Sequence, residues 1–131
     1  MPFPKELAPN DAWIAFRLNA APLATRADGD YNVMGLLDPV TGLMVGMQLT
    51  PADSAEMTPD TARKLLEAGQ AYAEQLPRVL LLSHNQPGEV LGAEAQRLGI
   101  PVARLPSESL APLLDRPRFH FAECFPGARL N

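Results

Sequence analysis

A hairpin pattern in the first half of the chain constrains its fold more than any other feature. Two apolar segments, Tyr31–Leu37 and Leu43–Leu49, flank the turn sequence DPVTG at residues 38–42. Pro39 sets the φ angle that a type I turn requires, and Gly42 can adopt the left-handed conformation that closes such a hairpin. The pattern therefore predicts two antiparallel strands joined by a tight turn.

The remaining periodic segments lie between prolines, which interrupt helices and interior strands. We expect strands at Trp13–Leu18, Val79–Leu82 and Val102–Leu105, and helices at Pro59–Leu76, Gly88–Leu98 and Ser107–Leu114. A hairpin needs antiparallel pairing, whereas strand–helix–strand units need parallel pairing with right-handed crossovers. The order therefore predicts an α/β fold with a mixed five-stranded sheet and helices on both faces. Numbered in chain order, strands 1–3 should pair antiparallel, and strands 1, 4 and 5 should pair parallel.

A doubly wound, flavodoxin-like sheet is the competing architecture, and it requires a helix between the first and second strands. Residues 19–30 are too few and too rich in Pro and Gly for that helix, so they predict a loop. We therefore place Trp13–Leu18 between Tyr31–Leu37 and Val79–Leu82. It should run antiparallel to the former and parallel to the latter.

The clearest helix signal begins at Thr58, a good N-cap, followed by Pro59 at the first helical position. Apolar residues then recur at spacings of three and four, which predicts one apolar face. We expect Leu65, Leu66, Tyr72 and Leu76 to pack on the sheet, and Arg63, Lys64, Glu67 and Glu74 to face solvent.

Composition limits the class of protein. A chain of 131 residues with 47% apolar residues fits one domain, residues 1–131, with an irregular arm at 1–11 and an aromatic tail at 117–131. A net charge of −4 with scattered basic residues counts against nucleic-acid binding. One cysteine, no apolar secretion segment and no spanning run favour a cytoplasmic protein without a membrane partner.

Two motifs resemble the ribonuclease H-like superfamily, of the integrase and transposase catalytic-core type. Residues 36–49 (LLDPVTGLMVGMQL) are similar to its second and third strands, which read as an aliphatic run, an Asp, a turn and another aliphatic run. Residues 83–86 (SHNQ) and 98–100 (LGI) are similar to motifs that flank a later helix of the family. The resemblance covers about Trp13 to Leu105 and implies a ribonuclease H-like fold.

The resemblance also implies metal-dependent chemistry, in which carboxylates on the first strand, the fourth strand and a later helix hold two divalent metals. This chain has Phe16 at the first position and His84 at the second. The candidates for the third position are Glu108, Asp115 and Glu123. An imidazole and one carboxylate are a poor ligand set for two Mg²⁺ ions, so we expect no metal site and no cofactor.

Three residues are candidates for ligand binding: His84, Asn85 and Asn19. His84 follows a central strand at the carboxyl edge of the sheet, where open α/β sheets bind ligands. It either serves as a general base or ligand donor with Asn85, or the two only cap the following helix. Asn19 lies close in sequence to Phe16. Elsewhere, Cys124 fits a buried, inert thiol beside aromatic side chains better than a zinc ligand with His120.

Two hypotheses about function remain open. The favoured one is a non-catalytic ribonuclease H-like module that binds a protein partner or forms a homo-oligomer, with the N-terminal arm and the aromatic tail as candidate contact surfaces. The alternative is an atypical hydrolase or nuclease whose site surrounds His84 and Asn85.

Overall fold

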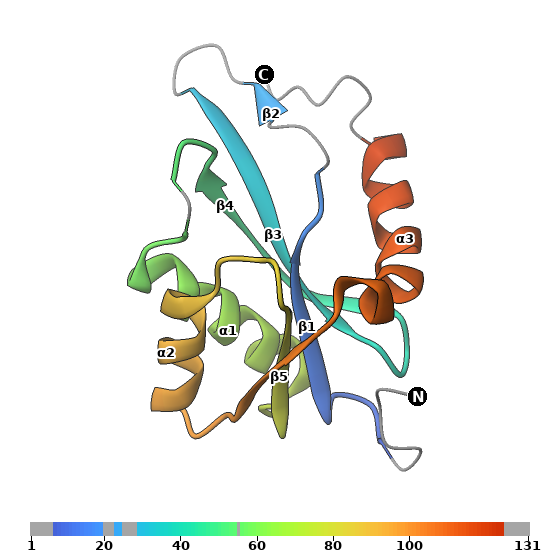
Figure 1. Cartoon of the computed structure of the whole chain (residues 1–131). Coiled ribbons are helices and arrows are strands. Elements are labelled where there is room, and N and C mark those ends of the chain that lie inside the picture. The colour runs from blue at the N-terminus through green and yellow to red at the C-terminus, as the bar shows by residue number, and fades with distance from the viewer. Residues whose placement is uncertain (1–6, 20–22, 25–28, 55, 125–131) are drawn as a thin grey trace.

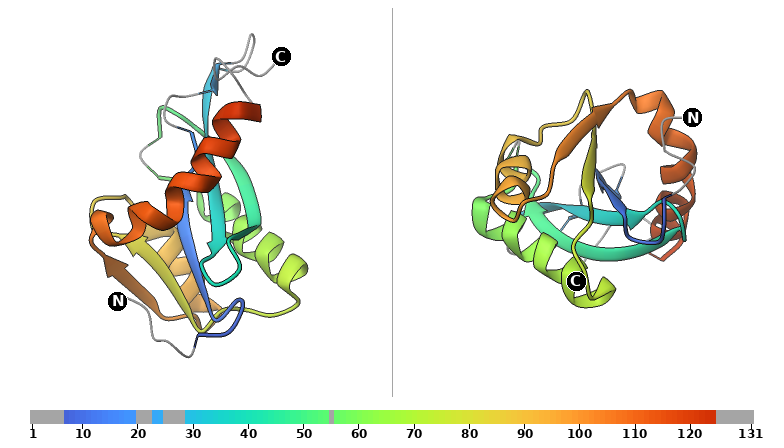
Figure 2. Two further views of the ribbon diagram at one scale, coloured as in Figure 1. Left: turned by 90° about the vertical axis from the view of Figure 1, so that its right-hand side faces the viewer. Right: turned by 90° about the horizontal axis from the view of Figure 1, so that it is seen from below.

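The computed structural model describes residues 7–19, 23–24, 29–54 and 56–124. Its elements are β1 (Ala12–Arg17), β2 (Leu23–Ala24), β3 (Asp30–Asp38), β4 (Leu43–Pro51), α1 (Pro59–Ala73), β5 (Val79–Ser83), α2 (Glu89–Arg97), β6 (Val102–Leu105) and α3 (Ser107–Cys124). The sheet separates α1 and α2 on one face from α3 on the other (Figure 1). A view from the side shows the same layers (Figure 2). No helix in the described ranges is long and apolar enough to cross a membrane.

The strands form one mixed sheet in the order β4-β3-β1-β5-β6. β1 pairs antiparallel with β3 and parallel with β5, and β5 pairs parallel with β6. This arrangement confirms the predicted position of the first strand. β2 was not predicted: its two residues, inside the expected loop, pair with Asp30 and Tyr31 at the start of β3.

The hairpin turn between β3 and β4 forms as the sequence predicts. Gly42 has a φ of 78°, and its N–H donates to the carbonyl oxygen of Asp38 at 2.8 Å. Asp38 is 1% exposed, and its carboxylate accepts from the Val40 N–H at 3.0 Å and the Thr41 hydroxyl at 2.7 Å. The Asp therefore stabilises the turn by hydrogen bonds to the residues that follow it.

α1 begins as expected, because the Thr58 hydroxyl accepts from the Thr61 N–H at 3.1 Å. Leu65 and Leu66 are fully buried, and the four charged residues predicted to face solvent are exposed. The prediction for Tyr72 is wrong, since it is 59% exposed. The helix ends at Ala73, and Ala73 and Leu76 pack against the core at this end of the apolar stripe.

Two glycines let α1 lie close to the sheet. A Cβ on Gly69 would be 2.8 Å from Cη2 of the buried Trp13 ring. A Cβ on Gly46 of β4 would be 3.2 Å from the Leu65 carbonyl oxygen. The absence of side chains at these two positions permits the close contact of α1 with β1 and β4.

α3 is longer than the sequence predicts. It passes through Pro112 and Pro117 to Cys124, so residues 117–124 of the expected tail are helical. Residues 125–131 of that tail lie outside the described residues. Leu110 and Leu114 are buried and Phe121 packs on the same core, because one face of α3 covers the sheet. Cys124 is exposed, which contradicts the expected buried thiol: it belongs to the last turn, beyond Phe121, where the helix leaves the core.

Candidate functional site

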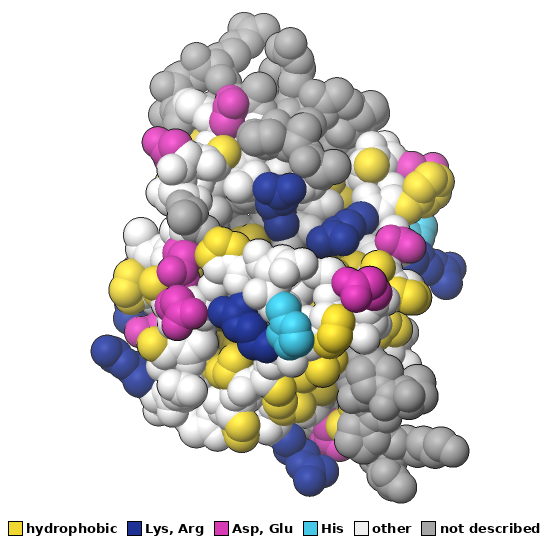
Figure 3. Space-filling model, viewed as in Figure 1, with side chains coloured by type: hydrophobic (Ala, Val, Ile, Leu, Met, Phe, Trp, Pro, Cys, Tyr) yellow, Lys and Arg dark blue, Asp and Glu magenta, His cyan; other side chains and the backbone are white. Residues whose placement is uncertain are grey.

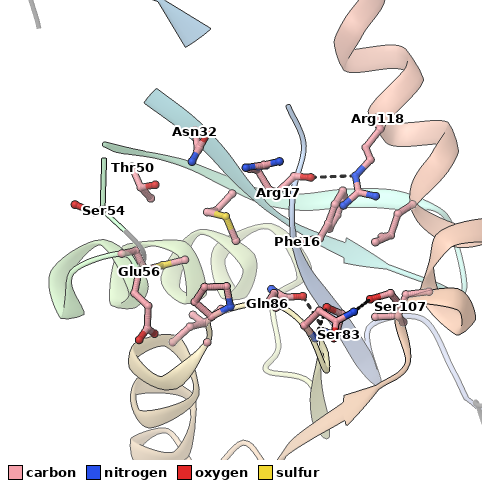
Figure 4. A pocket seen from close by; sticks show the side chains of 18 of the residues that line it. Phe16, Arg17, Asn32, Thr50, Ser54, Glu56, Ser83, Gln86, Ser107 and Arg118 are labelled. Atoms are coloured by element: carbon pink, nitrogen blue, oxygen red, sulfur yellow. Dashed lines mark hydrogen bonds between the residues drawn. The ribbon is translucent and has the colours of Figure 1, made fainter. Parts of the chain in front are cut away.

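A cavity of about 550 Å³ opens at the edge of the sheet beside the carboxyl ends of β1 and β5, between α3 and the start of α2. Its walls come from β1, the ends of β3 and β4 farther from the turn, the segment before α1, the β5–α2 loop and α3 (Figure 4). Because β1 and β5 are parallel neighbours, their carboxyl ends meet at one edge, where open α/β sheets bind ligands. The cavity is therefore the candidate site.

An aromatic ring and two arginines form one wall of the cavity. Phe16 is 2% exposed, and the Arg118 guanidinium lies 5.4 Å from its ring centroid. The Arg118 Nε–H donates to the Arg17 carbonyl oxygen at 3.0 Å (Figure 4). Desolvation lowers the pKa of Arg118, and the charge of Arg17 lowers it further, whereas Asp115 acts in the opposite direction. The charges of Arg17 and Arg118 are thus close enough on this wall to interact.

The opposite wall is a connected set of polar groups on the β5–α2 loop and the start of α3. The Ser83 N–H donates to Gln86 Oε1 at 2.8 Å, and Asn85 Nδ2 donates to the Ser107 hydroxyl at 3.2 Å. Arg104 of β6 donates to the carbonyl oxygens of Ser83 and Gln86, at 2.8 and 2.5 Å. These hydrogen bonds fix the loop against β6 and α3, so its polar side chains have defined positions.

The three predicted binding residues lie in different surroundings. Asn85 is on the cavity wall. His84 is exposed and outside the lining: its Nε2 lies 3.2 Å from the Arg104 carbonyl oxygen. Asn19 is buried, where its Oδ1 accepts from the Val33 N–H at 2.8 Å and its Nδ2 donates to Asn32 Oδ1 at 3.0 Å. Asn19 thus holds the end of β1 against β3, and the binding role of all three residues stays a prediction.

The three candidates for the third carboxylate of the family's metal site are not on the cavity wall. Glu108, Asp115 and Glu123 are exposed on α3 and outside the lining. The lining carboxylate is Glu56, whose Oε1 accepts from the Val90 N–H in the first turn of α2 at 2.8 Å. Within the described ranges, no group of three or more His, Cys, Asp or Glu residues is placed to hold a metal ion.

Sequence reasoning missed the residues that give the cavity its charge. Arg17 follows Phe16 directly, but nothing in the sequence distinguishes it from other surface arginines. Arg118 lies in the segment expected to be a tail, and it reaches the cavity only because α3 continues past Pro117. The aromatic residues of the tail were the available signal that this segment packs on the core, because Phe121 contacts the core there.

Comparisons with known proteins identify the fold. No family model and no curated protein matches the sequence. A catalytic core domain of BIV integrase superposes with a TM-score of 0.54 at 13% identity, covering 87% of this chain and 68% of that one. A chain of the simian T-cell lymphotropic virus intasome, in complex with the PP2A regulatory subunit B56 gamma, gives a TM-score of 0.52 at 14% identity. The match covers 94% of this chain and 45% of that one. The predicted fold is thus confirmed: this chain has the ribonuclease H-like fold of retroviral integrase catalytic cores.

Proposed function

We propose that this chain is a non-catalytic ribonuclease H-like module that associates with a second copy of itself through β4. The observation that supports this function is an uncharged, apolar strand at the edge of the sheet. β4 pairs with β3 on one side, and no other strand of the described residues pairs with its second side. An edge strand presents unpaired backbone N–H and C=O groups, which can bind a further strand.

The side chains of β4 favour such pairing. Leu43, Met47 and Leu49 are 52%, 53% and 47% exposed. Met47 and Leu49 alternate with Gln48, so they share the face opposite the one on which Gly46 contacts α1. No charged residue lies between Pro39 and Ala52. Monomeric sheet proteins commonly protect their edges with charges, bulges or short strands. β4 has a bulge near its start, where Leu36 faces Gly46 and Leu37 faces Met44, and the strand continues beyond it to Pro51.

A second copy is the partner that fits this edge best. Antiparallel pairing of two β4 strands about a twofold axis joins two identical surfaces, as in most dimers. Because the strand carries no charge, this pairing places no like charges opposite each other. The apolar side chains of Met47 and Leu49 would then meet their counterparts. Of the two contact surfaces expected from the sequence, the aromatic tail is less suited, because Phe121 packs on the core. Residues 1–6 of the arm lie outside the described residues.

The residues at the ends of β1 and β5 support the non-catalytic part of the proposal. Phe16 lines the cavity beneath the Arg118 guanidinium, and Ser83 ends β5. An aromatic ring under a cation is a poor environment for Mg²⁺, which binds carboxylate oxygens in proteins. His84 lies outside the cavity lining, which weakens the alternative of a hydrolase with a base at this position. The cytoplasmic location expected from the sequence is also part of this proposal.

Sedimentation equilibrium of two matched variants tests the self-association. Leu49→Lys places a charge on β4, whereas Leu98→Lys places one at a leucine of similar exposure, 42% against 47%, at the end of α2. We expect the parent chain and Leu98→Lys to form concentration-dependent dimers. Leu49→Lys should be monomeric, because an edge lysine opposes strand pairing.

Chemical denaturation should first show that both variants retain the parent unfolding transition, since both substituted leucines are exposed. The proposal fails if the parent chain stays monomeric up to about 1 mM, where even an association free energy of about −4 kcal/mol would give dimers. It also fails if Leu49→Lys and Leu98→Lys dimerise equally well.

A further inference from the structure

The backbone hydrogen bonds of β4 show which of its residues point toward the free edge of the sheet. In an antiparallel pair of strands, opposed residues alternate between exchanging both backbone hydrogen bonds and exchanging none. The Ala52 N–H donates to the Asp30 carbonyl oxygen at 2.9 Å, so the alternation along β4 can be counted from this pair. It directs the backbone groups of Gln48 toward β3 and those of Met47 and Leu49 away from it.

Hydrogen bonds on the other side of β3 support this count. Val33, which lies opposite Leu49, donates its N–H to Asn19 Oδ1 at 2.8 Å and accepts from the Leu18 N–H at 2.8 Å. Both backbone groups of Val33 therefore point away from Leu49. In the part of the chain that the structure describes, β3 is the one strand that pairs with β4, so the outward groups of Met47 and Leu49 have no strand beside them.

Two features confine the regular part of this free edge to a short segment around Gln48. Pro51, the next outward residue after Leu49, has no N–H to donate. Toward the turn, a bulge before Gly46 breaks the alternation of the ladder. A partner strand can therefore pair regularly only with the segment between the bulge and Pro51.

The opposite edge of the sheet is charged. β6 is the last strand there, and it contains Arg104, whose guanidinium lies 3.7 Å from the Glu89 carboxylate. β6 lies in front in Figure 1, and basic, acidic and histidine side chains lie on the surface of that side (Figure 3). Leu43–Pro51 of β4 contains no charged residue. Of the two edges, β4 is therefore the one that can meet its own copy without opposing like charges.

We propose that two copies join their β4 strands in one antiparallel register, with the twofold axis between the two Gln48 residues, so that the two sheets become continuous. This inference rests on the self-association proposed above and specifies its geometry. Met47 of each copy then lies opposite Leu49 of the other. Because both residues point outward, each such pair exchanges both backbone hydrogen bonds, and every outward N–H and C=O of the segment has a partner.

The neighbouring symmetric registers leave backbone groups without partners. An axis at Met47 would place Leu49 opposite Val45, the extra residue of the bulge, where the alternation is broken. An axis at Leu49 would place Met47 opposite Pro51, whose missing N–H leaves the Met47 carbonyl oxygen unpaired. The hydrogen bonds therefore favour the axis at Gln48.

The side chains also suit this register. Met47 and Leu49 are 53% and 47% exposed, and as cross-strand neighbours they would cover each other in the dimer. Gln48 is partly exposed on the other face of the sheet, where it would lie opposite its own copy. An amide group has both donors and an acceptor, so the two Gln48 side chains can hydrogen-bond to each other across the axis.

Disulfide cross-linking tests the register, in a Cys124→Ser background that removes the exposed thiol. Gln48→Cys would place two thiols opposite each other in a pair with Cα atoms about 4.5 Å apart, which a disulfide can bridge. We expect mild oxidation to cross-link the Gln48→Cys dimer. Leu49→Cys would be about 7–8 Å from its own copy, so it should cross-link about tenfold more slowly.

A mixing experiment gives an independent check of the same register. Met47→Cys and Leu49→Cys chains, each slow to cross-link alone, should form a mixed disulfide when combined, because their Cα atoms would be about 5.5 Å apart. The mass of the product identifies this mixed dimer. Leu98→Cys is the matched control, since it exposes a thiol at the end of α2 and gives the rate of random collisions.

Amide hydrogen exchange of the parent chain requires no substitution, so it remains available if Gln48→Cys fails to fold. The N–H groups of Met47 and Leu49 should exchange about tenfold more slowly at concentrations where the chain is dimeric than where it is monomeric. The Gln48 N–H, which bonds to β3 in both states, should change less. Equal exchange of the Met47 and Leu49 N–H groups in the monomer and the dimer would overturn the proposal.

Sedimentation equilibrium separates failure of this register from failure of self-association. A dimer in which Leu49→Cys or Met47→Cys cross-links faster than Gln48→Cys would overturn the register and leave association through β4 in place. A dimer in which all three variants cross-link at the rate of Leu98→Cys would place the interface away from β4. A parent chain that stays monomeric would remove self-association and this register with it.

Discussion

At the scale of single residues, two helical glycines show how surroundings reverse the effect of the same substitution. Gly69 lies in α1 against the sheet, and an added Cβ would approach Cη2 and Cζ3 of Trp13 to 2.8 and 2.9 Å. Gly92 lies in α2, where an added Cβ would find its nearest neighbour, a Val102 methyl, at 3.9 Å. Only the first position excludes a methyl group.

We expect Gly69→Ala to lower the free energy of unfolding by about 1–3 kcal/mol, since the buried Trp13 ring cannot move without disturbing the core. Gly92→Ala should raise it by about 0.5–1 kcal/mol, because alanine restricts the unfolded chain and favours the helix. Chemical denaturation measures both changes. A stabilised Gly69→Ala variant would contradict the close contact between α1 and β1.

At the scale of elements, α1 shows how a sequence period becomes a packed face. Leu65 and Leu66 are fully buried, whereas the next residue, Glu67, is exposed. Leu66→Ala should leave a cavity and lower the free energy of unfolding by about 2–5 kcal/mol. Glu67→Ala should change it by no more than about 0.5 kcal/mol, as surface substitutions usually do. The two variants differ by one position, so denaturant titrations compare them directly. Equal midpoints for Leu66→Ala and the parent would refute the assigned face.

At the scale of the whole molecule, the fold is that of integrase catalytic cores, and the cavity lies where its parallel strands end. We expect Mn²⁺ soaked into crystals of this chain to show no pair of ions about 4 Å apart near Phe16 and His84. The reason is that the lining combines Phe16, Arg17 and Arg118 with the engaged carboxylate of Glu56. Anomalous scattering locates bound Mn²⁺ directly. A pair of ions at this distance would show that the chain retains the metal site that its resemblance implies.

The sequence by itself determined most of the elements and most of the topology. The DPVTG turn, the Thr58 cap and the apolar periods act over a few residues, so their structural effects are local. The handedness of crossover connections then leaves few ways to arrange the strands, and the predicted order is the one observed.

Only the tertiary structure decided the remaining features, because they depend on residues far apart in the chain. At the end of α1, Ala73 packs against the core in place of the expected Tyr72. In α3, the helix continues past Pro117, and Phe121 in that continuation packs against the core. The cavity unites Arg17 and Arg118, 101 positions apart. Charge and spacing in the sequence carry no signal for such a pair, since it exists only when β1 and α3 pack on each other.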